Sequence, residues 1–271
     1  MISIKKKIRL FFIWIFARKY FYKFNKLMYS LSLNSLGILN YENERLSGEY
    51  SFINKLTKYL NEDAVILDVG ANVGRYSNQI AKLKPETKIY AFEPHPKTFK
   101  VLEKNARLNG YTALQFACGQ KPTKLKLYDY DERDGSSHAS LYKDVIQDFY
   151  NSNPTEHLVE AIDLDSFVAE KNIKNIALLK IDVEGNEYAV LQGLKRSVEN
   201  DIIEIIHWEF NNMNVISRTF FKDFYDFLDN YHIYRMLPDS LIPLGDYKPM
   251  FCEIYAFQNI VAIHKNSQFN P

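Results

Sequence analysis

The chain has 271 residues, of which 46% are hydrophobic and 25% charged, and a formal net charge of +1. This length and composition fit one large domain with an appendage, and they provide ample apolar sequence for a packed core. The two cysteines, Cys118 and Cys252, belong to no CxxC or Cys/His pattern, which argues against a disulfide framework and a structural zinc site and fits a reducing compartment.

The first 30 residues are basic and aromatic. They contain no acid, so the rest of the chain has a net charge of −7; the eight basic residues are Lys5, Lys6, Lys7, Arg9, Arg18, Lys19, Lys23 and Lys26. The apolar run at residues 10–17 is too short to cross a bilayer, which takes about 20 residues. It is followed by Arg18-Lys19 and not by a small-residue cleavage site, which argues against a secretory signal.

Two interpretations of this basic segment stay open. A basic aromatic helix can lie in the headgroup region of an anionic membrane, where each Lys or Arg contributes about 1 kcal/mol. It can equally pack on the domain or on a second subunit. A nucleic-acid partner is disfavoured because the rest of the chain is acidic. We expect a cytoplasmic protein, peripheral at the inner face of the membrane under the first interpretation, and the sequence leaves its oligomeric state open.

Residues 31–48 are rich in Asn, Ser and Gly and indicate a linker or loops that close over a site. We therefore expect residues 1–48 to form a basic helix with a linker, and residues 49–271 to form the main domain. The apolar positions from Phe52 to Leu60 have helical spacing. Glu49 lies in the first turn of that helix, where a carboxylate is ordinarily a favourable helix start, and a ligand contact is the alternative.

An apolar, β-branched run at residues 65–69 leads into a turn with Gly70 and Gly74, and helix-compatible sequence follows. This pattern predicts a strand, a tight turn and a helix, with the glycines allowing the backbone close to a ligand. A dinucleotide turn needs Gly-x-Gly-x-x-Gly to make room for a pyrophosphate. Here Asn72 occupies the middle position and Asp68 adds a carboxylate, which suits a cationic or amine-bearing ligand.

The next predicted strand, residues 88–92, runs into Glu93. An acidic residue about 20 positions after the glycine turn commonly accepts both hydrogen bonds of a ribose diol. A ribose site without a pyrophosphate turn favours S-adenosylmethionine over NAD.

The remaining chain continues the alternation of helices and strands. The predicted helices are residues 75–84, 96–109, 166–171, 187–194 and 220–231, and the predicted strands are residues 112–119, 124–128, 157–162, 176–181, 202–210, 233–237 and 254–257. The strand at 176–181 is apolar except for Lys180, which is typical of a parallel sheet covered on both faces. The sequence thus predicts a doubly wound, mostly parallel α/β sheet with helices on both faces and ligands at the carboxyl ends of its strands.

Four segments resemble the FkbM family of S-adenosylmethionine-dependent methyltransferases: residues 66–74, 91–94, 162–165 and 179–185. The likeness covers about residues 45–215. The first segment is shared with many methyltransferases, whereas the last, Leu-Lys-Ile-Asp-Val-Glu-Gly, is much more specific in combination with it. The resemblance implies a Rossmann-like methyltransferase domain that moves a methyl group from S-adenosylmethionine to a hydroxyl, often on a sugar or polyketide.

The resemblance also implies roles for individual residues. The positions that would line the methionine part of the cofactor are Asp68, Gly70, Asn72 and Gly74. Glu93 would hold the ribose, Cys118 would lie near the adenine, and Asp182 and Glu184 would face the acceptor or the sulfonium. The basic amino terminus lies outside the family pattern, so the resemblance does not decide its role.

Methyl transfer to a hydroxyl requires alignment and a group that removes the hydroxyl proton. The candidates at strand ends are Asp182, Glu184, His207 and Glu209, and strand alternation would place 182 with 184 and 207 with 209. We favour metal-free base catalysis by Asp182, Glu184 or His207 over a divalent cation held by these groups. His207 is alternatively a buried histidine bonded to backbone, and His138, in a polar loop, fits a solvated residue better.

Three functions follow from these patterns. We predict an O-methyltransferase that acts on a sugar hydroxyl in a surface glycan or glycolipid precursor. An NAD-dependent sugar oxidoreductase is disfavoured by Asn72 in the turn. A non-catalytic membrane-associated scaffold is disfavoured because it would not need the acidic residues at the strand ends. The sequence does not identify the acceptor.

Overall fold

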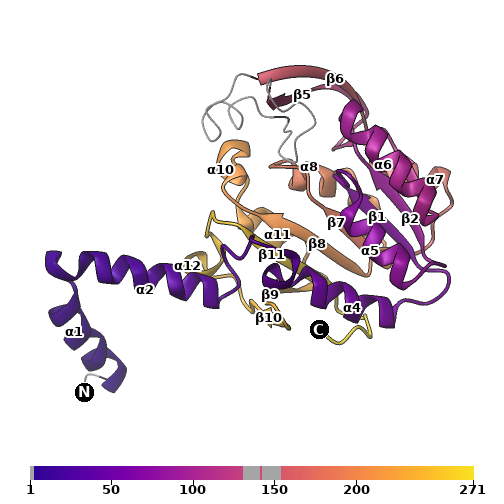
Figure 1. The fold of residues 1–271 in the computed structure, drawn as a ribbon. Coiled ribbons are helices and arrows are strands. Elements are labelled where there is room, and N and C mark those ends of the chain that lie inside the picture. Colours follow the sequence, from indigo (N-terminus) through magenta and orange to yellow (C-terminus); the bar gives the residue numbers. More distant parts are fainter. Residues whose placement is uncertain (1–2, 131–140, 142–153) are drawn as a thin grey trace.

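A computed structural model of the protein describes residues 3–130, 141 and 154–271 (Figure 1). Its main sheet has eight strands in the order β10-β9-β11-β8-β7-β1-β2-β3. The bounds are Val65–Val69 for β1, Lys88–Phe92 for β2, Thr112–Leu114 for β3, Leu178–Ile181 for β7, Ile205–Phe210 for β8, Tyr231–Met236 for β9, Leu241–Pro243 for β10 and Gln258–His264 for β11. This arrangement confirms the α/β prediction.

Strands β3, β2, β1, β7 and β8 run parallel, and β11 joins them antiparallel to β8. The chain winds from β1 outward to β3 and then returns to β7 on the other side of β1, so the strand order reverses between β1 and β7. Open α/β sheets bind ligands outside the carboxyl ends of the strands at such a reversal. The topology therefore places the site beside Gly70 and Asp182, which follow these two strands.

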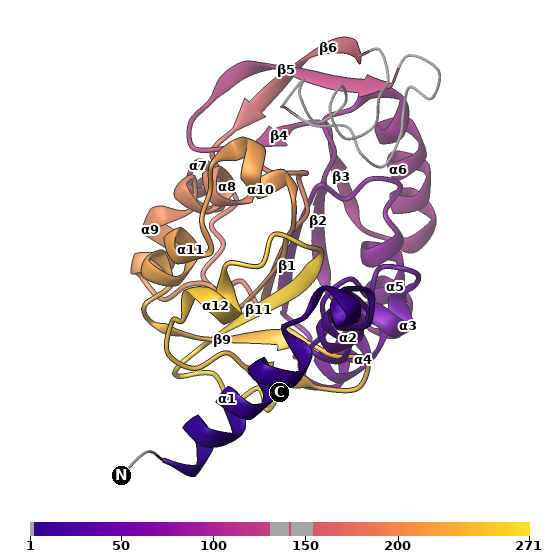
Figure 2. The ribbon, with the colours of Figure 1, turned by 90° about the vertical axis from the view of Figure 1, so that its left-hand side faces the viewer.

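Helices cover both faces of this sheet (Figure 2). One face carries α4 Glu49–Tyr59, α5 Arg75–Leu83 and α6 Pro96–Asn109, and the other carries α7 Leu164–Glu170, α8 Glu187–Gln192, α9 Lys195–Glu199 and α11 Phe221–Phe227. Phe52 and Ile80 belong to the core on the first face, and Phe167 and Phe224 to the core on the second. Each such fully buried side chain contributes about 1.5 to 3 kcal/mol, which fixes the strand ends relative to each other.

A second, three-stranded sheet has the order β4-β6-β5. The bounds are Ala117–Cys118 for β4, Thr123–Tyr130 for β5 and Pro154–Ile162 for β6. It corrects the predicted single strand at residues 112–119. The chain turns at Phe116, whose N–H donates to the Leu114 carbonyl, so β3 pairs with β2 while β4 pairs with β6 in the other sheet. The predicted loop residue His138 lies outside the described residues.

The predicted closing strand at residues 254–257 is wrong. Short helix α12, Pro249–Cys252, precedes this segment, and the actual strand is β11, which is buried along its whole length between β8 and β9. The sequence pattern missed it because its apolar run covers only residues 260–263 and is flanked by polar residues. Other boundaries also shift: the predicted helix at 187–194 ends at Gln192 as α8, a separate helix, α9, follows it, and Tyr231 begins β9 instead of ending the preceding helix.

The amino-terminal segment contains more helix than predicted. It comprises α1 Ile4–Phe16, a 3-10 turn at Lys19–Phe21, α2 Tyr22–Ser35 and α3 Glu44–Ser47, so α2 runs into the expected linker. Figure 1 shows α1 and α2 projecting away from the domain body. Within the described residues, no helix has both the length and the apolar character needed to cross a membrane.

The reversal between β1 and β7 requires glycine at position 70. Gly70 has a φ of +81°, and an added Cβ would lie 1.7 Å from the carbonyl oxygen of Asp182. We expect Gly70→Ala to lower the thermal unfolding temperature and the soluble yield strongly. The added Cβ would force the backbone to move where the turns after β1 and β7 touch. Gly110→Ala is the matched control: its φ is also positive, +78°, but nothing lies within 4 Å.

Gly110→Ala should lower the free energy of unfolding only by the strain of an alanine in the left-handed conformation, about 1 to 2 kcal/mol. Thermal unfolding monitored by circular dichroism compares the two variants. Equal shifts in the unfolding temperature would contradict the close approach of the two turns.

Candidate active site

A cavity of about 1090 Å³ opens at the carboxyl ends of β1, β2, β7 and β8. Its wall includes the turn after β1, the end of β2, the turn after β7 and the end of β8. Leu39 and residues 41–43, which precede α3, contribute to its rim together with α10, Met213–Ser217. This position agrees with the strand reversal and is large enough for a drug-sized ligand, since such pockets span about 300 to 1000 Å³.

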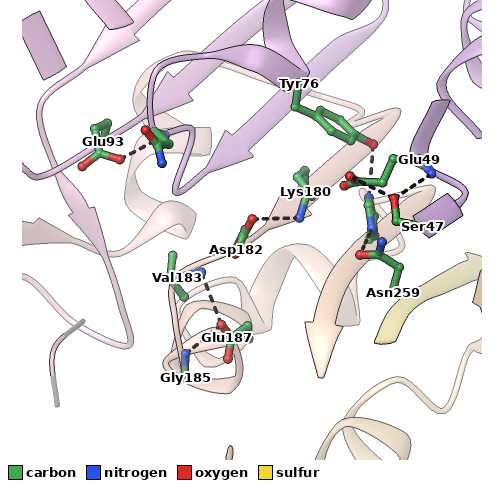
Figure 3. A network of polar contacts seen from close by, with 12 residues as sticks. Ser47, Glu49, Tyr76, Glu93, Lys180, Asp182, Val183, Gly185, Glu187 and Asn259 are labelled. Carbon is green, nitrogen blue, oxygen red and sulfur yellow. Dashed lines mark hydrogen bonds and ion pairs between the residues drawn. The ribbon is translucent and has the colours of Figure 1, made fainter. Parts of the chain in front are cut away.

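Glu93 lies at the β2 end of the cavity (Figure 3). Its two carboxylate oxygens accept hydrogen bonds from the backbone N–H groups of Asn72, at 3.0 Å, and His95, at 2.8 Å. Burial raises the pKa of Glu93 to about 7, against these two hydrogen bonds, which lower it. Each oxygen keeps a lone pair, so the carboxylate fits a ribose diol while also holding the glycine turn in place.

The glycines of the turn are also required by the surrounding protein. Both have positive φ, but a Cβ at Gly70 would collide with Asp182, and one at Gly74 would lie 2.3 Å from the Tyr111 hydroxyl oxygen. Neighbouring protein atoms, and not only a ligand, therefore require glycine at these positions. Asn72 has a φ of +51°, which an asparagine tolerates better than most residues.

Three polar residues form a row across adjacent strands. Asp68 on β1 is in register with Lys180 on β7, and Lys180 is in register with His207 on β8. All three are buried, and Lys180 is only 3% exposed. Burial raises the pKa of Asp68 to about 6, although a hydrogen bond from the Ser77 hydroxyl lowers it.

Lys180 is the cation at the centre of this row. Burial lowers its pKa, but the surrounding carboxylates outweigh that effect and the pKa is raised; they are Asp182, Glu209, Glu49 and Asp68. Its Nζ atom lies 3.4 Å from Asp182 Oδ2 and 5.8 Å from the centre of the Tyr76 ring. Lys180 therefore stays charged and draws these carboxylates together from four different elements.

Asp182 and Glu184 are in the turn after β7 and not on the strand, which corrects the predicted alternation. Glu184 has a φ of +53°. The turn is held by Glu187, whose Oε1 accepts from the N–H groups of Val183, at 3.3 Å, and Gly185, at 2.9 Å (Figure 3). Burial raises the pKa of Glu187 to about 7. Glu187 therefore positions the two carboxylates that precede it.

Glu209 and Glu49 complete the group around Lys180. Burial first, and then repulsion by Asp182, raises the pKa of Glu209 well above its usual range, while Lys180 opposes the shift. Burial also raises the pKa of Glu49, which accepts a hydrogen bond from the Ser47 hydroxyl at 3.4 Å. Figure 3 shows Glu49 and Glu93 on opposite sides of Asp182. The predicted cofactor residue Glu49 thus lies with the Lys180 group and away from the predicted ribose residue.

His207 lies behind the cavity wall. Its Nδ1 is 3.2 Å from the Tyr76 hydroxyl and its Nε2 is 3.0 Å from Asn259 Oδ1. Burial, assisted by Lys180, lowers its pKa well below the usual value, so the ring is neutral. It bonds side chains instead of backbone, and it reaches the cavity only through Tyr76, which does line it.

The structure brings most of the predicted site residues to one cavity. Those that line it are Glu49, Asp68, Gly70, Asn72, Glu93, Cys118, Asp182, Glu184 and Glu209. Gly74 and His207 support it from outside. In the described part of the chain, no group of three or more His, Cys, Asp or Glu side chains is arranged to hold a metal ion.

Sequence reasoning did not single out Lys180 or Glu187 as site residues. Lys180 could have been found as the lone charge in an otherwise apolar strand, since a buried lysine needs partners. Glu187 gave a weaker signal, a carboxylate two positions after a glycine at a helix start. Only the folded turn shows that it accepts hydrogen bonds from the preceding backbone.

The reversal of strand order, the ribose-type carboxylate and the acidic cavity define a Rossmann-like S-adenosylmethionine-dependent methyltransferase. The residues fit that cofactor, because Glu93 has acceptor capacity at one end and carboxylates suited to a sulfonium line the wall. The methyltransferase FkbM domain matches residues 68–236, and the chain belongs to this family. Membership of this family favours a methyltransferase over the oxidoreductase and scaffold alternatives.

Similar proteins include Methyltransferase 1 of Beauveria bassiana, 30% identical over 162 residues. The hexuronic acid methyltransferase AglP of Haloferax volcanii is 27% identical over 164 residues, and the 2-O-methyltransferase NoeI of Sinorhizobium fredii is 24% identical over 150 residues. The matches cover 53%, 60% and 50% of this chain, and 65%, 64% and 59% of those proteins. The chain thus spans about two thirds or less of the length of these relatives.

Glu93→Gln should weaken cofactor binding, because one carboxylate oxygen is replaced by a donor and the charge that strengthens the ribose hydrogen bonds is lost. A charge-assisted hydrogen bond contributes about 1.5 to 3 kcal/mol, so we expect the dissociation constant of S-adenosylhomocysteine to rise about 10- to 100-fold in calorimetry. Glutamine keeps an acceptor for the turn, which alanine would not.

Glu103→Gln on α6 is the control, since Glu103 pairs with Arg107 on the outer surface. NAD should give no heat of binding with either protein. If Glu93→Gln changes the dissociation constant of S-adenosylhomocysteine by less than threefold, this carboxylate does not hold the ribose.

Proposed function

We propose that the protein methylates a hydroxyl of a sugar in a surface glycan or its glycolipid precursor. The observation that carries this proposal is the group of carboxylates around buried Lys180, on the side of the cavity away from Glu93. If Glu93 binds the ribose, the cofactor occupies that side and these carboxylates face the acceptor. Carboxylate and amide side chains are suited to bind sugar hydroxyls, and a carboxylate can also take the hydroxyl proton.

The relatives support a hydroxyl acceptor. One is described as a 2-O-methyltransferase and another as a hexuronic acid methyltransferase. The rim of the cavity adds amide and aromatic side chains that can contact a sugar ring; they are Asn43, Asn211, Asn212, Tyr41 and Tyr255.

We assign the role of base to Glu209. When bound, S-adenosylmethionine supplies the methyl group, and the protein must align the acceptor hydroxyl and take its proton. A pKa raised above the usual range means that the ionised Glu209 carboxylate is a stronger proton acceptor than an ordinary one. Lys180 opposes the burial that raises the pKa values of Glu209 and Glu49, and Asp182, whose side chain is 35% exposed and held by Lys180, orients the hydroxyl.

His207 then acts as a positioning residue. It fixes the Tyr76 hydroxyl at 3.2 Å, and Asn259 fixes the other side of the imidazole. Burial lowers the pKa of His207, so its ring binds a proton weakly, and His207 does not line the cavity. His207 is therefore a poorer base than Glu209. Glu184, in the turn after β7, lines the cavity beside Asp182 and contributes to acceptor binding.

Glu209→Gln and Asp182→Asn should each lower turnover while cofactor affinity persists, because each amide keeps the size of the carboxyl group but cannot take or hold a proton. Loss of a positioned base typically costs about 10²- to 10⁴-fold. Transfer of labelled methyl groups to a glycolipid extract measures turnover, and calorimetry with S-adenosylhomocysteine measures binding. Full turnover of Glu209→Gln together with an inactive Asp182→Asn would move the base to Asp182.

His207→Gln should cost less than Glu209→Gln in the same assay, since it acts through Tyr76. Chelator followed by magnesium should leave turnover unchanged if a side chain is the base. Restoration of a lost activity by magnesium would instead support a metal-bound hydroxyl.

The acceptor class is tested by mass spectrometry of cell-surface glycans from cells with and without the gene. We expect a sugar that carries one methyl group fewer when the gene is absent and that regains it when the gene is restored. The Asp182→Asn variant should not restore it. Unchanged glycans, together with a methylated small molecule that disappears, would contradict the sugar acceptor.

A further inference from the structure

In the described part of the chain, helices α1 and α2 present apolar side chains to solvent with little protein surface against them. Within the described residues, α1 buries none of its side chains and α2 buries only Leu33. The exposed fractions are 62% for Phe11, 67% for Trp14 and 90% for Tyr20. Leaving this many large apolar groups in water is unfavourable, which marks an interaction surface.

We propose that residues 3–35 bind the surface of an anionic lipid membrane. α1 has 13 residues, so at about 1.5 Å per residue it is far shorter than the roughly 30 Å of a hydrocarbon core. A helix of this length lies along the headgroup region, with its apolar side chains in the acyl boundary. Trp14 and the tyrosines suit this depth, because one end of each ring is apolar and the other polar.

The charge of the segment selects an anionic surface. Its eight Lys and Arg side chains have no acidic neighbour in the first 30 residues. Lys5, Lys6 and Lys7 occupy the first turns of α1, and the apolar residues Leu10 to Phe16 follow them. The same charge disfavours pairing with the helices of a second copy, because the two segments would repel each other.

The two helices form one unit. The ring of Phe16 packs on Phe12, Phe21 and Phe24, with centroid distances of 4.6, 5.2 and 6.2 Å. The Asn25 side-chain amide donates to the Phe16 carbonyl at 2.9 Å, and Arg18 Nε donates to the Trp14 carbonyl at 3.0 Å. These contacts fix the bend between α1 and α2, so both helices can contact the same surface.

Residues 3–35, the proposed membrane anchor, are connected directly to the rim of the cavity. After α2 ends at Ser35, Ile38 is fully buried and bridges to Gln258, and the Leu39 N–H donates to the Phe257 carbonyl at 2.8 Å. Leu39 and Phe257 both line the cavity. If the proposed sugar acceptor is correct, this attachment holds the cavity beside a lipid-linked acceptor; the membrane contact itself does not depend on that reaction.

Vesicle flotation of the full chain tests the contact. The protein should float with vesicles of phosphatidylcholine and phosphatidylglycerol, and not with phosphatidylcholine alone, and high salt should weaken binding. Lys5/Lys6/Lys7→Glu should lower the partition coefficient about 100-fold or more, since each basic residue contributes several-fold and the new acids repel the surface. Lys100/Lys104/Lys121→Glu makes the same change in net charge at exposed positions of the domain and should leave binding intact.

Tryptophan fluorescence gives an independent measurement. The chain has two tryptophans, of which Trp208 is fully buried and Trp14 is exposed. Addition of anionic vesicles should shift the emission to the blue, and Trp14→Phe should abolish the shift while the protein still floats. Binding of S-adenosylhomocysteine by every variant shows that the domain is folded, separately from the choice of acceptor.

Three results would overturn the proposal. One is equal flotation with neutral and anionic vesicles, and another is equal loss of binding in both triple variants. The third is self-association in ultracentrifugation that Lys5/Lys6/Lys7→Glu abolishes while no vesicle binding occurs, which would assign the surface to a second copy.

Discussion

The site depends on the buried charge of Lys180. An ammonium group taken out of water costs several kcal/mol unless charges of the opposite sign surround it. Here the compensation comes from Asp68 on β1, Asp182 after β7, Glu209 on β8 and Glu49 on α4. Without the lysine these carboxylates would repel one another, so the cation and the acids stabilise a single arrangement. The carboxylates that line the cavity suit a cationic sulfonium cofactor.

Close packing of two turns gives this charge arrangement its geometry. The turn after β1 and the turn after β7 touch at Gly70 and Asp182, and the Asp182 N–H donates to the Val69 carbonyl at 2.9 Å. Glu93 bonds one turn through the N–H of Asn72, and Glu187 bonds the other through the N–H of Gly185. Two buried carboxylates thus hold the backbone that carries the functional ones, which limits the movement of the cavity wall.

The amino-terminal helices extend this organisation outward. Ile38 fixes the chain to the central strand β11, and the residues that follow it form part of the cavity rim before α4 places Glu49 beside Lys180. Recognition of a surface by α1 and α2 and recognition of an acceptor in the cavity would therefore use neighbouring parts of one segment.

The sequence by itself determined the local features: the strand, turn and helix at residues 65–83, the acid that ends β2, and the specific segment at residues 179–185. These features could be predicted because hydrophobic periodicity and turn chemistry act between residues close in the chain. They were sufficient to identify the fold class and the cofactor, and most of the site residues that they predicted line the cavity. The strand β11 escaped because its apolar run, residues 260–263, is only four residues long and has the polar Gln258, Asn259 and His264 beside it.

Only the tertiary structure decided which of these features meet. Asp68, Lys180 and His207 are far apart in the sequence, and their alignment depends on the register of β1, β7 and β8. In this register His207 lies behind Tyr76, whereas Glu209 lines the cavity. The sequence could not distinguish these two candidates at the end of the strand. Strand order and register are set by the burial of whole faces of helices and sheet, which no local pattern specifies.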